Sequence, residues 1–458
     1  MGEQTVIDHW SSVKDIIDKI CIHYDNLWKK RQRALNSKMI VMLILKIVLG
    51  DRRQGLSTNL TEFWDTCLEK GISLPQEKPV SASSFCEARQ KLSEDIFKDL
   101  NKNLLINWKQ KRDLPTWQGH RVYAVDGSRV NLPRELLDEG FKLYDKERRH
   151  YPQGLLSCLY DVLSKTVYDF DFVAHMNERT CVTEHLKVLE ANDLVILDRG
   201  YFSYFLLHEF HQKEIHAIFR LQQGTSNKQI EEFLASSKKD VSIDYIPSPT
   251  VISDLKKQGH MLKRKPLRLR LIKHKLNGET YFYGTTLLDK KKYPAFCFAY
   301  LYHERWDIEE LYKISKQIVD IENFHAKTRR GIKQEIYAHL LLINLSRFFE
   351  FDAQKLLPPS SEKDKEKCEE VDFYKFFNTA SMFNINFKNC LTIVGRYLTN
   401  LVLGINERLK NWVPRVLNMI SRVRQKIRPG RQYPIRSYKP TNKWQKTISR
   451  HKMTKKIC

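Results

Sequence analysis

The order of short apolar segments between residues 120 and 221 restricts the fold more than any other feature of this chain. In chain order these segments are His120–Val125, Leu155–Leu163, Val167–His175, Glu178–Leu189, Leu194–Leu197, Tyr204–Gln212 and Ala217–Leu221. The first three have the composition of strands joined by turns, which is typical of antiparallel neighbours. Helix-patterned segments lie on both sides of the strand at 194–197. Three strands followed by alternating helices and strands predict a mixed α/β sheet.

The rest of the chain predicts further regions around this sheet, because 458 residues are too many for one simple core. We expect a helical N-terminal domain over 1–115, a sheet-forming core over 116–222 and 296–350, a β-rich insertion over 223–295, and a helical C-terminal region with a basic tail over 351–458. Apolar residues at helical spacing predict that one helical stretch continues from 302 to 350.

Within the insertion, Leu267–Ile272 alternates leucines with Arg268 and Arg270, so a strand would direct leucines to one face and arginines to the other. Asn277–Gly278 predicts a type I′ hairpin turn after this strand. The stretch Lys256–Lys275 contains nine Lys and Arg residues. It is either a solvated edge strand protected by charge or a DNA-binding surface, and we favour DNA contact.

Charge is the second strong constraint. Lys and Arg number 78 against 54 Asp and Glu, which gives a formal net charge of +24 at pH 7. Such an excess attracts polyanions, and we favour nucleic acid over a membrane surface or a merely solvated basic face. The final 38 residues, 421–458, contain thirteen Lys or Arg and no acid, a pattern common in nucleic-acid-binding or disordered tails.

Cysteine usage and hydropathy indicate the compartment. The nine cysteines form no Cys-x-x-Cys pair and their number is odd, which argues against a zinc site or a disulfide framework and fits a reducing cytoplasm. The N-terminus lacks an apolar signal region, and Met39–Leu49, the longest apolar run, is too short to span a bilayer. We therefore expect a cytoplasmic protein of bacterial type that associates with DNA in the nucleoid and not with a membrane.

A helix near the end of the N-terminal region offers a possible DNA reader. Ser81 precedes the helical segment Phe85–Leu92 and is a suitable N-cap. With Arg89 and Lys91 on its exposed side, this helix could belong to a helix-turn-helix motif. An ordinary helical bundle with solvated cations explains the same residues equally well.

Residues Tyr302, Arg305, Glu309 and Lys316 lie at offsets 0, 3, 7 and 14 in a helix-compatible sequence. At about 3.6 residues per turn, all four fall on one face of a helix. That face carries a phenol, two cations and a carboxylate, a set that can hold a metal ion next to a nucleic-acid backbone.

Two further carboxylates, Asp126 and Asp198, each follow an apolar strand-like run. Together with Glu309 they could bind two divalent ions, which activate a water and stabilise the leaving oxygen in phosphodiester hydrolysis. Taken singly, an Asp after a strand is more often a turn residue or a helix cap. Several other acids compete for the same role: Asp161, Asp171, Asp193, Asp307 and Glu310.

The sequence here resembles a known family. The spacing Tyr302-(2)-Arg305-(3)-Glu309-(6)-Lys316 is similar to the Y-(2)-R-(3)-E-(6)-K signature of DDE transposases of bacterial insertion sequences, a group with a β-strand insertion in a ribonuclease H-like core. Asp198–Tyr201 matches the second-Asp motif of that family, and Val125–Ser128 matches its first. The resemblance covers roughly residues 80–350.

The resemblance implies cut-and-paste DNA transposition. One strand is cleaved at the element's end, the freed 3′ hydroxyl attacks the other strand to form a hairpin, and the reopened end attacks target DNA. It also implies a catalytic and metal-binding triad of Asp126, Asp198 and Glu309, two Mg²⁺ ions that Mn²⁺ can replace, and a homodimer on double-stranded transposon ends and target DNA.

In the same family comparison, Tyr302, Arg305 and Lys316 hold DNA phosphates, and Arg268 and Arg270 add contacts from the insertion. An aromatic residue next to the hairpin stabilises a flipped base in relatives, and the matching position here is Tyr281, where a relative has Trp. A buried strand aromatic is the other interpretation of Tyr281.

Two other functions stay open at this point. A ribonuclease H-like nuclease would cut DNA without joining it, and a descendant that has lost activity would only bind DNA. The stripe at 302–316 and the insertion favour the transposase over the nuclease, and the intact triad argues against the inactive descendant. In the transposase, the three carboxylates should converge although 72 and 111 residues separate them in sequence.

Overall fold

The computed structural model describes residues 3–28, 34–49, 54–144, 151–224, 227–276, 279–359, 381 and 383–427. The chain falls into two compact units, one formed by Met1–Leu357 and Ile385–Gln425 and the other by Pro358–Asn384 and Lys426–Cys458. All the predicted site residues belong to the first unit. Among the described helices, none is long and apolar enough to cross a membrane.

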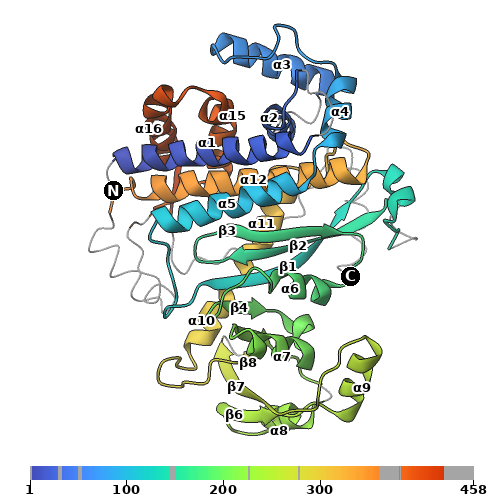
Figure 1. The fold of residues 1–458 in the computed structure, drawn as a ribbon. Helices are drawn as coiled ribbons and strands as arrows, with labels where there is room; N and C mark the ends of the chain where they lie inside the picture. The colour runs from blue at the N-terminus through green and yellow to red at the C-terminus, as the bar shows by residue number, and fades with distance from the viewer. Residues whose placement is uncertain are drawn as a thin grey trace, which may run out of the picture. The chain divides into compact units, whose positions relative to one another are not determined.

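An eight-stranded mixed sheet forms the centre of the first unit (Figure 1). Its strands are β1 (Val122–Asn131), β2 (Gln153–Asp161), β3 (Thr166–Val173), β4 (Leu194–Leu197), β5 (His216–Arg220), β6 (Asp240–Tyr245), β7 (Leu267–Leu276) and β8 (Glu279–Thr285). Their spatial order is β3-β2-β1-β4-β5-β8-β7-β6. β1 is antiparallel to β2 and parallel to β4, and β4 is parallel to β5. The predicted mixed α/β sheet of ribonuclease H type is confirmed.

The strands of the insertion extend the core sheet. β8 pairs with β5 in antiparallel fashion, with Arg220 opposite Tyr283, and β7 and β6 continue the sheet outward. β7 and β8 form the predicted hairpin, whose Asn277–Gly278 turn lies outside the described residues. Leu269 and Leu271 of β7 belong to the same buried cluster as β4 side chains, so the insertion and the core strands share one hydrophobic core.

The described α-helices are α1 (Glu3–Asn26), α2 (Ser37–Ile47), α3 (Leu56–Glu69), α4 (Ala82–Lys91), α5 (Asp95–Lys111), α6 (Glu178–His185), α7 (Tyr204–Gln212), α8 (Lys228–Ala235), α9 (Pro249–Lys257), α10 (Cys297–His303), α11 (Trp306–Gln317), α12 (Arg329–Gln354), α15 (Phe387–Leu403) and α16 (Asn406–Arg422). The 3-10 helices are η1 (Arg134–Glu139) and η2 (Arg199–Tyr201). Two short strands, β9 (Phe383–Ile385) and β10 (Arg424–Lys426), form a separate sheet.

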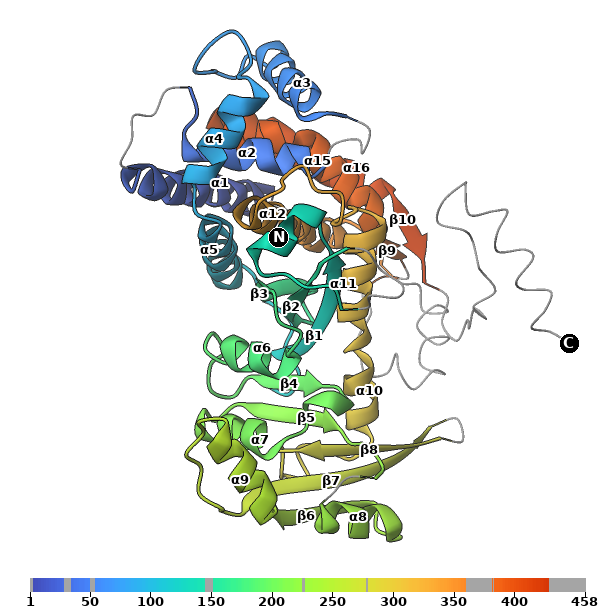
Figure 2. The ribbon, with the colours of Figure 1, turned by 90° about the vertical axis from the view of Figure 1, so that its right-hand side faces the viewer.

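Helices cover both faces of the core strands. α6 and α7 lie on one face and α10 and α11 on the other, with the sheet between them (Figure 2). A layer of long helices closes the β3 edge: α5 and α12 contact β3, and α1, α2, α15 and α16 pack around them. The predicted buried segment 338–345 lies in α12 and is buried throughout. Residues from both ends of the chain therefore complete one helical layer.

The single helical stretch predicted from 302 to 350 is wrong, because three helices occupy it. α10 and α11 are separated by one tight turn, and an extended loop separates α11 from α12. In the tight turn, the backbone N–H groups of Glu304 and Arg305 donate to carbonyls three residues back, as in a 3-10 helix. This turn places Arg305 at the start of α11.

Helix α4 begins as predicted, with the Ser81 side chain accepting from the backbone N–H of Ser84. The predicted exposure of Arg89 is wrong: its side chain is only 2% exposed. Arg89 lies four residues after the buried Phe85, so the two share the face of α4 that packs on α12.

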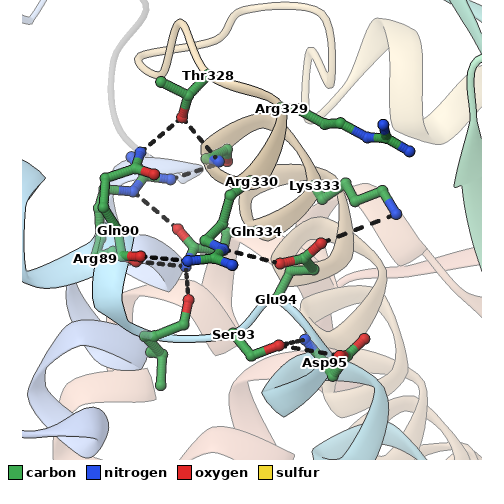
Figure 3. Close-up of polar contacts among 12 residues, drawn as sticks. Arg89, Gln90, Ser93, Glu94, Asp95, Thr328, Arg329, Arg330, Lys333 and Gln334 are labelled. Atoms are coloured by element: carbon green, nitrogen blue, oxygen red, sulfur yellow. Dashed lines mark hydrogen bonds and ion pairs between the residues drawn. The ribbon is translucent and has the colours of Figure 1, made fainter. Parts of the chain in front are cut away.

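Arg89 is completely engaged by α12 (Figure 3). Its guanidinium donates to Gln334 Oε1 at 3.0 Å, to Glu335 Oε1 at 2.9 Å and to the Gly331 carbonyl at 3.0 Å. Glu94 adds ion pairs with Arg330 and Lys333 at the rim of this contact. A buried, fully hydrogen-bonded cation thus fixes α4 to the catalytic half of the chain.

Arg89→Ala should destabilise the protein by about 3–5 kcal/mol, because it leaves the buried Glu335 carboxylate without its cation. Lys91→Ala, at an exposed position on the same helix, should change stability by less than about 0.5 kcal/mol. Chemical denaturation of the two variants beside the wild type measures the difference. Equal, small effects would show that the ion pair does not hold the two helices together.

Candidate active site

Asp126 lies within β1, and the turn predicted at 126–128 is wrong. β2 continues to pair with β1 as far as Asn131, so the strand does not end at Asp126. The parallel pairing of β1 with β4 does end, at Ala124 opposite Ile196. Asp126 therefore lies just beyond the carboxyl end of β4.

The register of β1 and β4 brings the first two carboxylates level. Val122 pairs with Leu194, and Asp126 and Asp198 each lie four residues further along their strands. Asp198 directly follows β4 and is the N-cap residue of η2. Because the strands are parallel, both aspartates leave the sheet at the same edge.

The Asp198 carboxylate is held by the third element of the site. The Tyr302 hydroxyl at the end of α10 donates to Asp198 Oδ1 at 2.8 Å. Burial alone would raise the pKa of Asp198. The Arg199 backbone N–H, the Tyr302 hydroxyl and the charge of Arg305 outweigh it and lower the pKa below its usual value. Asp198 is therefore ionised at neutral pH.

Arg305 is the cation shared by the three acids. Its Nη2 donates to Glu309 Oε1 at 2.8 Å, one helical turn further along α11. Its charge also acts on Asp126 and Asp198. The residue is only 4% exposed, so these interactions take place largely out of water. In low dielectric surroundings, one buried guanidinium offsets part of the repulsion among the carboxylates.

Asp126 has the opposite electrostatics to Asp198. Burial raises its pKa to about 6, against the N–H of Gly127 and the charge of Arg305, which lower it. The carboxylates of Glu178 and Glu309 raise it further. The site therefore holds more negative charge near Asp126 than Arg305 neutralises.

Two contacts fix α11 against β1. The buried Tyr312 hydroxyl donates to the backbone carbonyl of Asp126 at 2.7 Å, and Lys316 Nζ donates to the carbonyl of Arg129 at 2.7 Å. The predicted stripe Tyr302–Lys316 thus faces the sheet edge that carries the aspartates.

The acids that competed in the sequence have local roles. Asp161 accepts the backbone N–H groups of Leu163 and Ser164, so it is a turn residue. The others form ion pairs with cations outside the site: Asp171 with Lys98, Asp193 with Arg121, Asp307 with Lys165, and Glu310 with Lys313.

Sequence reasoning missed Arg220, the last residue of β5. Its guanidinium lies 5.2 Å from the centre of the Tyr281 ring and 5.9 Å from that of Tyr302, and its charge lowers the pKa of Asp198. Tyr281 is partly exposed and donates to Glu279 Oε2 at 2.9 Å. The missed signal was position: β5 is parallel to β4, so its end lies at the same sheet edge as Asp198.

The prediction of Arg270 as a DNA contact is wrong. Its side chain is buried and donates to both oxygens of Asp240, at 2.9 and 2.7 Å, and to the carbonyls of Leu287 and Tyr293. The arginine face of β7 is covered, not open. Arg268 is exposed and forms only a 3.3 Å ion pair with Asp244, so it remains accessible.

The donor chemistry of this edge suits a hard divalent cation. Among the residues that the structure describes, no three His, Cys, Asp or Glu side chains are arranged to hold one ion together. The carboxylate oxygens are nevertheless the ligands that magnesium prefers, and Asp126 carries charge that is incompletely neutralised. Convergence of the triad on shared ions stays a prediction.

The fold and this edge define a nucleic-acid phosphotransfer enzyme, and comparison with known proteins gives the family. Residues 117–345, half of the chain, match the family described as Transposase DDE domain, so the chain belongs to it. It is a DDE transposase, which cleaves DNA phosphodiesters and transfers strands, as predicted. Membership in this family also implies dependence on a divalent metal and DNA as partner.

Individual relatives are more distant. Transposase InsG for insertion sequence element IS4 from Escherichia coli (strain K12) is 24% identical over 329 residues, covering 69% of this chain and 70% of the relative. The transposase for insertion sequence element IS231F from Bacillus thuringiensis subsp. israelensis is 25% identical over 246 residues, covering 45% of this chain and 52% of the relative. A solved piggyBac transposase synaptic complex with hairpin DNA aligns with a TM-score of 0.41 and 12% identity, over 94% of this chain and 87% of that one.

The two aspartates should have opposite effects on stability in metal-free protein. A raised pKa means that ionised Asp126 destabilises the folded state, so Asp126→Asn should unfold at a higher temperature than wild type at pH 7.5. That gain should disappear as the pH falls through about 6 toward the ordinary value of 3.8. The lowered pKa of Asp198 stabilises the fold above its usual range, so Asp198→Asn should unfold at a lower temperature.

Thermal unfolding in the presence of a chelator, at pH 4 and pH 7.5, measures both changes. Destabilisation by Asp126→Asn at pH 7.5 would contradict the electrostatic description of this site.

Proposed function

We propose that this transposase moves its element by the cut-and-paste route, with Asp126, Asp198 and Glu309 as its metal-binding triad. The in-register placement of the two aspartates, both facing the guanidinium that binds Glu309, carries this proposal. Every step of the route is an in-line displacement at phosphorus. One set of carboxylates can therefore serve strand cleavage, hairpin formation and strand transfer in turn.

The triad would hold two Mg²⁺ ions, replaceable by Mn²⁺, which make the attacking oxygen more nucleophilic and stabilise the leaving 3′ oxygen. Tyr302 and Arg305 are both 4% exposed and bonded to Asp198 and Glu309, so their first task is to hold these carboxylates in place. Arg305 also has the fork of donors that suits a DNA phosphate. Lys316, on the same stripe, offers a single positive charge to the backbone.

Tyr281 and Arg220 form the side of the site that receives an unpaired base. Tyr281 projects from β8 with its ring next to the Arg220 guanidinium, and Arg220 in turn lies next to Tyr302. A base displaced from the hairpin end would stack on the Tyr281 ring while Arg220 holds the neighbouring phosphate.

The wider DNA surface follows from charge. Exposed cations of the insertion, including Arg268, would bind duplex without reading its sequence. The basic tail would act in the same way, and from residue 428 onward it lies outside the described residues. A homodimer would hold two transposon ends together before they attack target DNA.

Asp126→Ala and Glu309→Ala should each lower cleavage and strand transfer by about 10³-fold or more, equivalent to about 4 kcal/mol of transition-state stabilisation. Binding to transposon ends should persist, because a metal ligand acts on the transition state more than on duplex affinity. Glu310→Ala is the matched control, since Glu310 is exposed and paired with Lys313. Gel assays on intact and precleaved ends measure both activities.

Loss of end binding in parallel with cleavage would show that these acids are structural. Wild-type enzyme that nicks DNA but never joins precleaved 3′ ends to a target would identify a nuclease.

Tyr281→Ala should impair hairpin formation while leaving the first nick nearly unchanged. Stacking of a base on an aromatic ring contributes about 1–3 kcal/mol, so the loss should be roughly 5- to 150-fold. Tyr281→Phe keeps the ring and should behave like wild type, although it loses the bond to Glu279. The measurement compares intact ends with prenicked ends, and equal loss on both would remove Tyr281 from this role.

A further inference from the structure

A fourth carboxylate lies next to the triad and belongs to none of the sequence motifs. Glu178 is the first residue of α6, and its side chain lies over the backbone of Gly127, the residue after Asp126. A Cβ atom added at Gly127 would be 3.1 Å from both Cγ and Oε1 of Glu178, and 2.9 Å from Cδ1 of Leu155. The glycine therefore allows this carboxylate to approach β1.

The approach has an electrostatic consequence. The charge of Glu178 raises the pKa of Asp126 more than the charge of Glu309 does. Glu178 is thus the carboxylate with the stronger influence on Asp126, although Glu309 is the one that the family signature marks.

The second motif holds Glu178 in place. The hydroxyl of Tyr201, in the Asp198–Tyr201 motif, donates to Glu178 Oε2 at 2.9 Å, and Tyr201 is only 3% exposed. The bond leaves Oε1 as the oxygen that lies over Gly127. The last residue of one motif and the glycine of the other therefore meet at the same side chain.

The far end of α6 is anchored as well. His185, its last residue, lies 2.7 Å from Asp169 Oδ2 through Nδ1 and 3.0 Å from the Ser157 hydroxyl through Nε2. Ser157 is opposite Gly127 in the β1–β2 pairing, and Asp169 is in β3. This buried chain of hydrogen bonds ties α6 to two strands of the sheet and so fixes the position of Glu178.

We infer that Glu178 is a further metal ligand of this transposase, supplying an oxygen to the divalent ion held by Asp126. The inference rests on the proposed triad and adds to it a residue from α6. Tyr201 is then a positioning residue, whose hydroxyl keeps the Glu178 carboxylate turned toward Asp126. An acid that merely begins a helix would need neither the Tyr201 bond nor the glycine at position 127.

Iron-directed backbone cleavage tests the inference without relying on DNA chemistry. Fe²⁺ bound in place of Mg²⁺ generates hydroxyl radicals with ascorbate and peroxide, and these cut the full-length protein near the ion. Wild type should be cut close to Asp126. Glu178→Gln, which keeps the shape and the contact with Tyr201, should raise the half-saturating Fe²⁺ concentration at least tenfold, as loss of a metal-site partner typically does by about 10- to 100-fold.

The matched control is Glu184→Gln, on the same helix, where the carboxylate is exposed and paired with Lys187. It should leave the half-saturating concentration unchanged. Tyr201→Phe keeps the Glu178 carboxylate but frees it, so it should weaken Fe²⁺ binding by a smaller factor. Combined with Glu178→Gln it should add nothing further, because both changes act through one carboxylate.

The outcomes separate the two hypotheses. Cleavage of Glu178→Gln at the wild-type Fe²⁺ concentration would overturn the role of Glu178 and leave the triad intact. Cleavage of Asp126→Asn at the wild-type concentration, or no local cleavage of wild type at all, would overturn the metal site itself. If Glu178→Gln fails to fold, Tyr201→Phe decides: an unchanged Fe²⁺ concentration overturns the inference.

Discussion

The candidate site depends on a single buried guanidinium, that of Arg305. It bonds to Glu309 and its charge acts on Asp126 and Asp198, which come from other elements of the fold. Carboxylates that are partly withdrawn from water repel one another strongly, and the fold can hold them together only with a cation among them. Arg305 reaches that position because the chain makes one tight turn between α10 and α11.

The arrangement leaves the site poised for a metal ion and costs the protein stability. Asp198 is well satisfied, whereas Asp126 keeps a raised pKa because burial and neighbouring acids oppose its charge. A group that is unfavourable in the metal-free fold becomes favourable when a cation binds. Strain of this electrostatic kind is common where function needs a charge that stability alone would not keep.

The sequence predicts the parts of this site that depend on local pattern. Asp198 after the run Leu194–Leu197, the cap at Ser81 and the β7–β8 pairing were all visible as short-range signals. Asp126 was correctly associated with a strand but wrongly placed in a turn. Gly127 suggests a turn, whereas its real role is to let Glu178 approach the strand.

Features that depend on distant partners could not be predicted in this way. Arg89 and Arg270 look like solvated cations in sequence, and each is buried because a carboxylate elsewhere compensates it: Glu335 lies 246 residues from Arg89, and Asp240 lies 30 residues from Arg270. Arg220 and Glu178 carry no motif. Their approach to the site follows from strand order and helix placement, which only the assembled sheet reveals.

The central claim is that Asp126, Asp198 and Glu309 bind divalent metal around the position of Arg305. The most direct test is an anomalous-scattering measurement on crystals of the enzyme with transposon-end DNA and Mn²⁺. The account predicts manganese peaks bound by oxygens of Asp126 and by at least one of Asp198 and Glu309, close to the scissile phosphate. Manganese bound elsewhere on the protein, with these carboxylates free of metal, would contradict it.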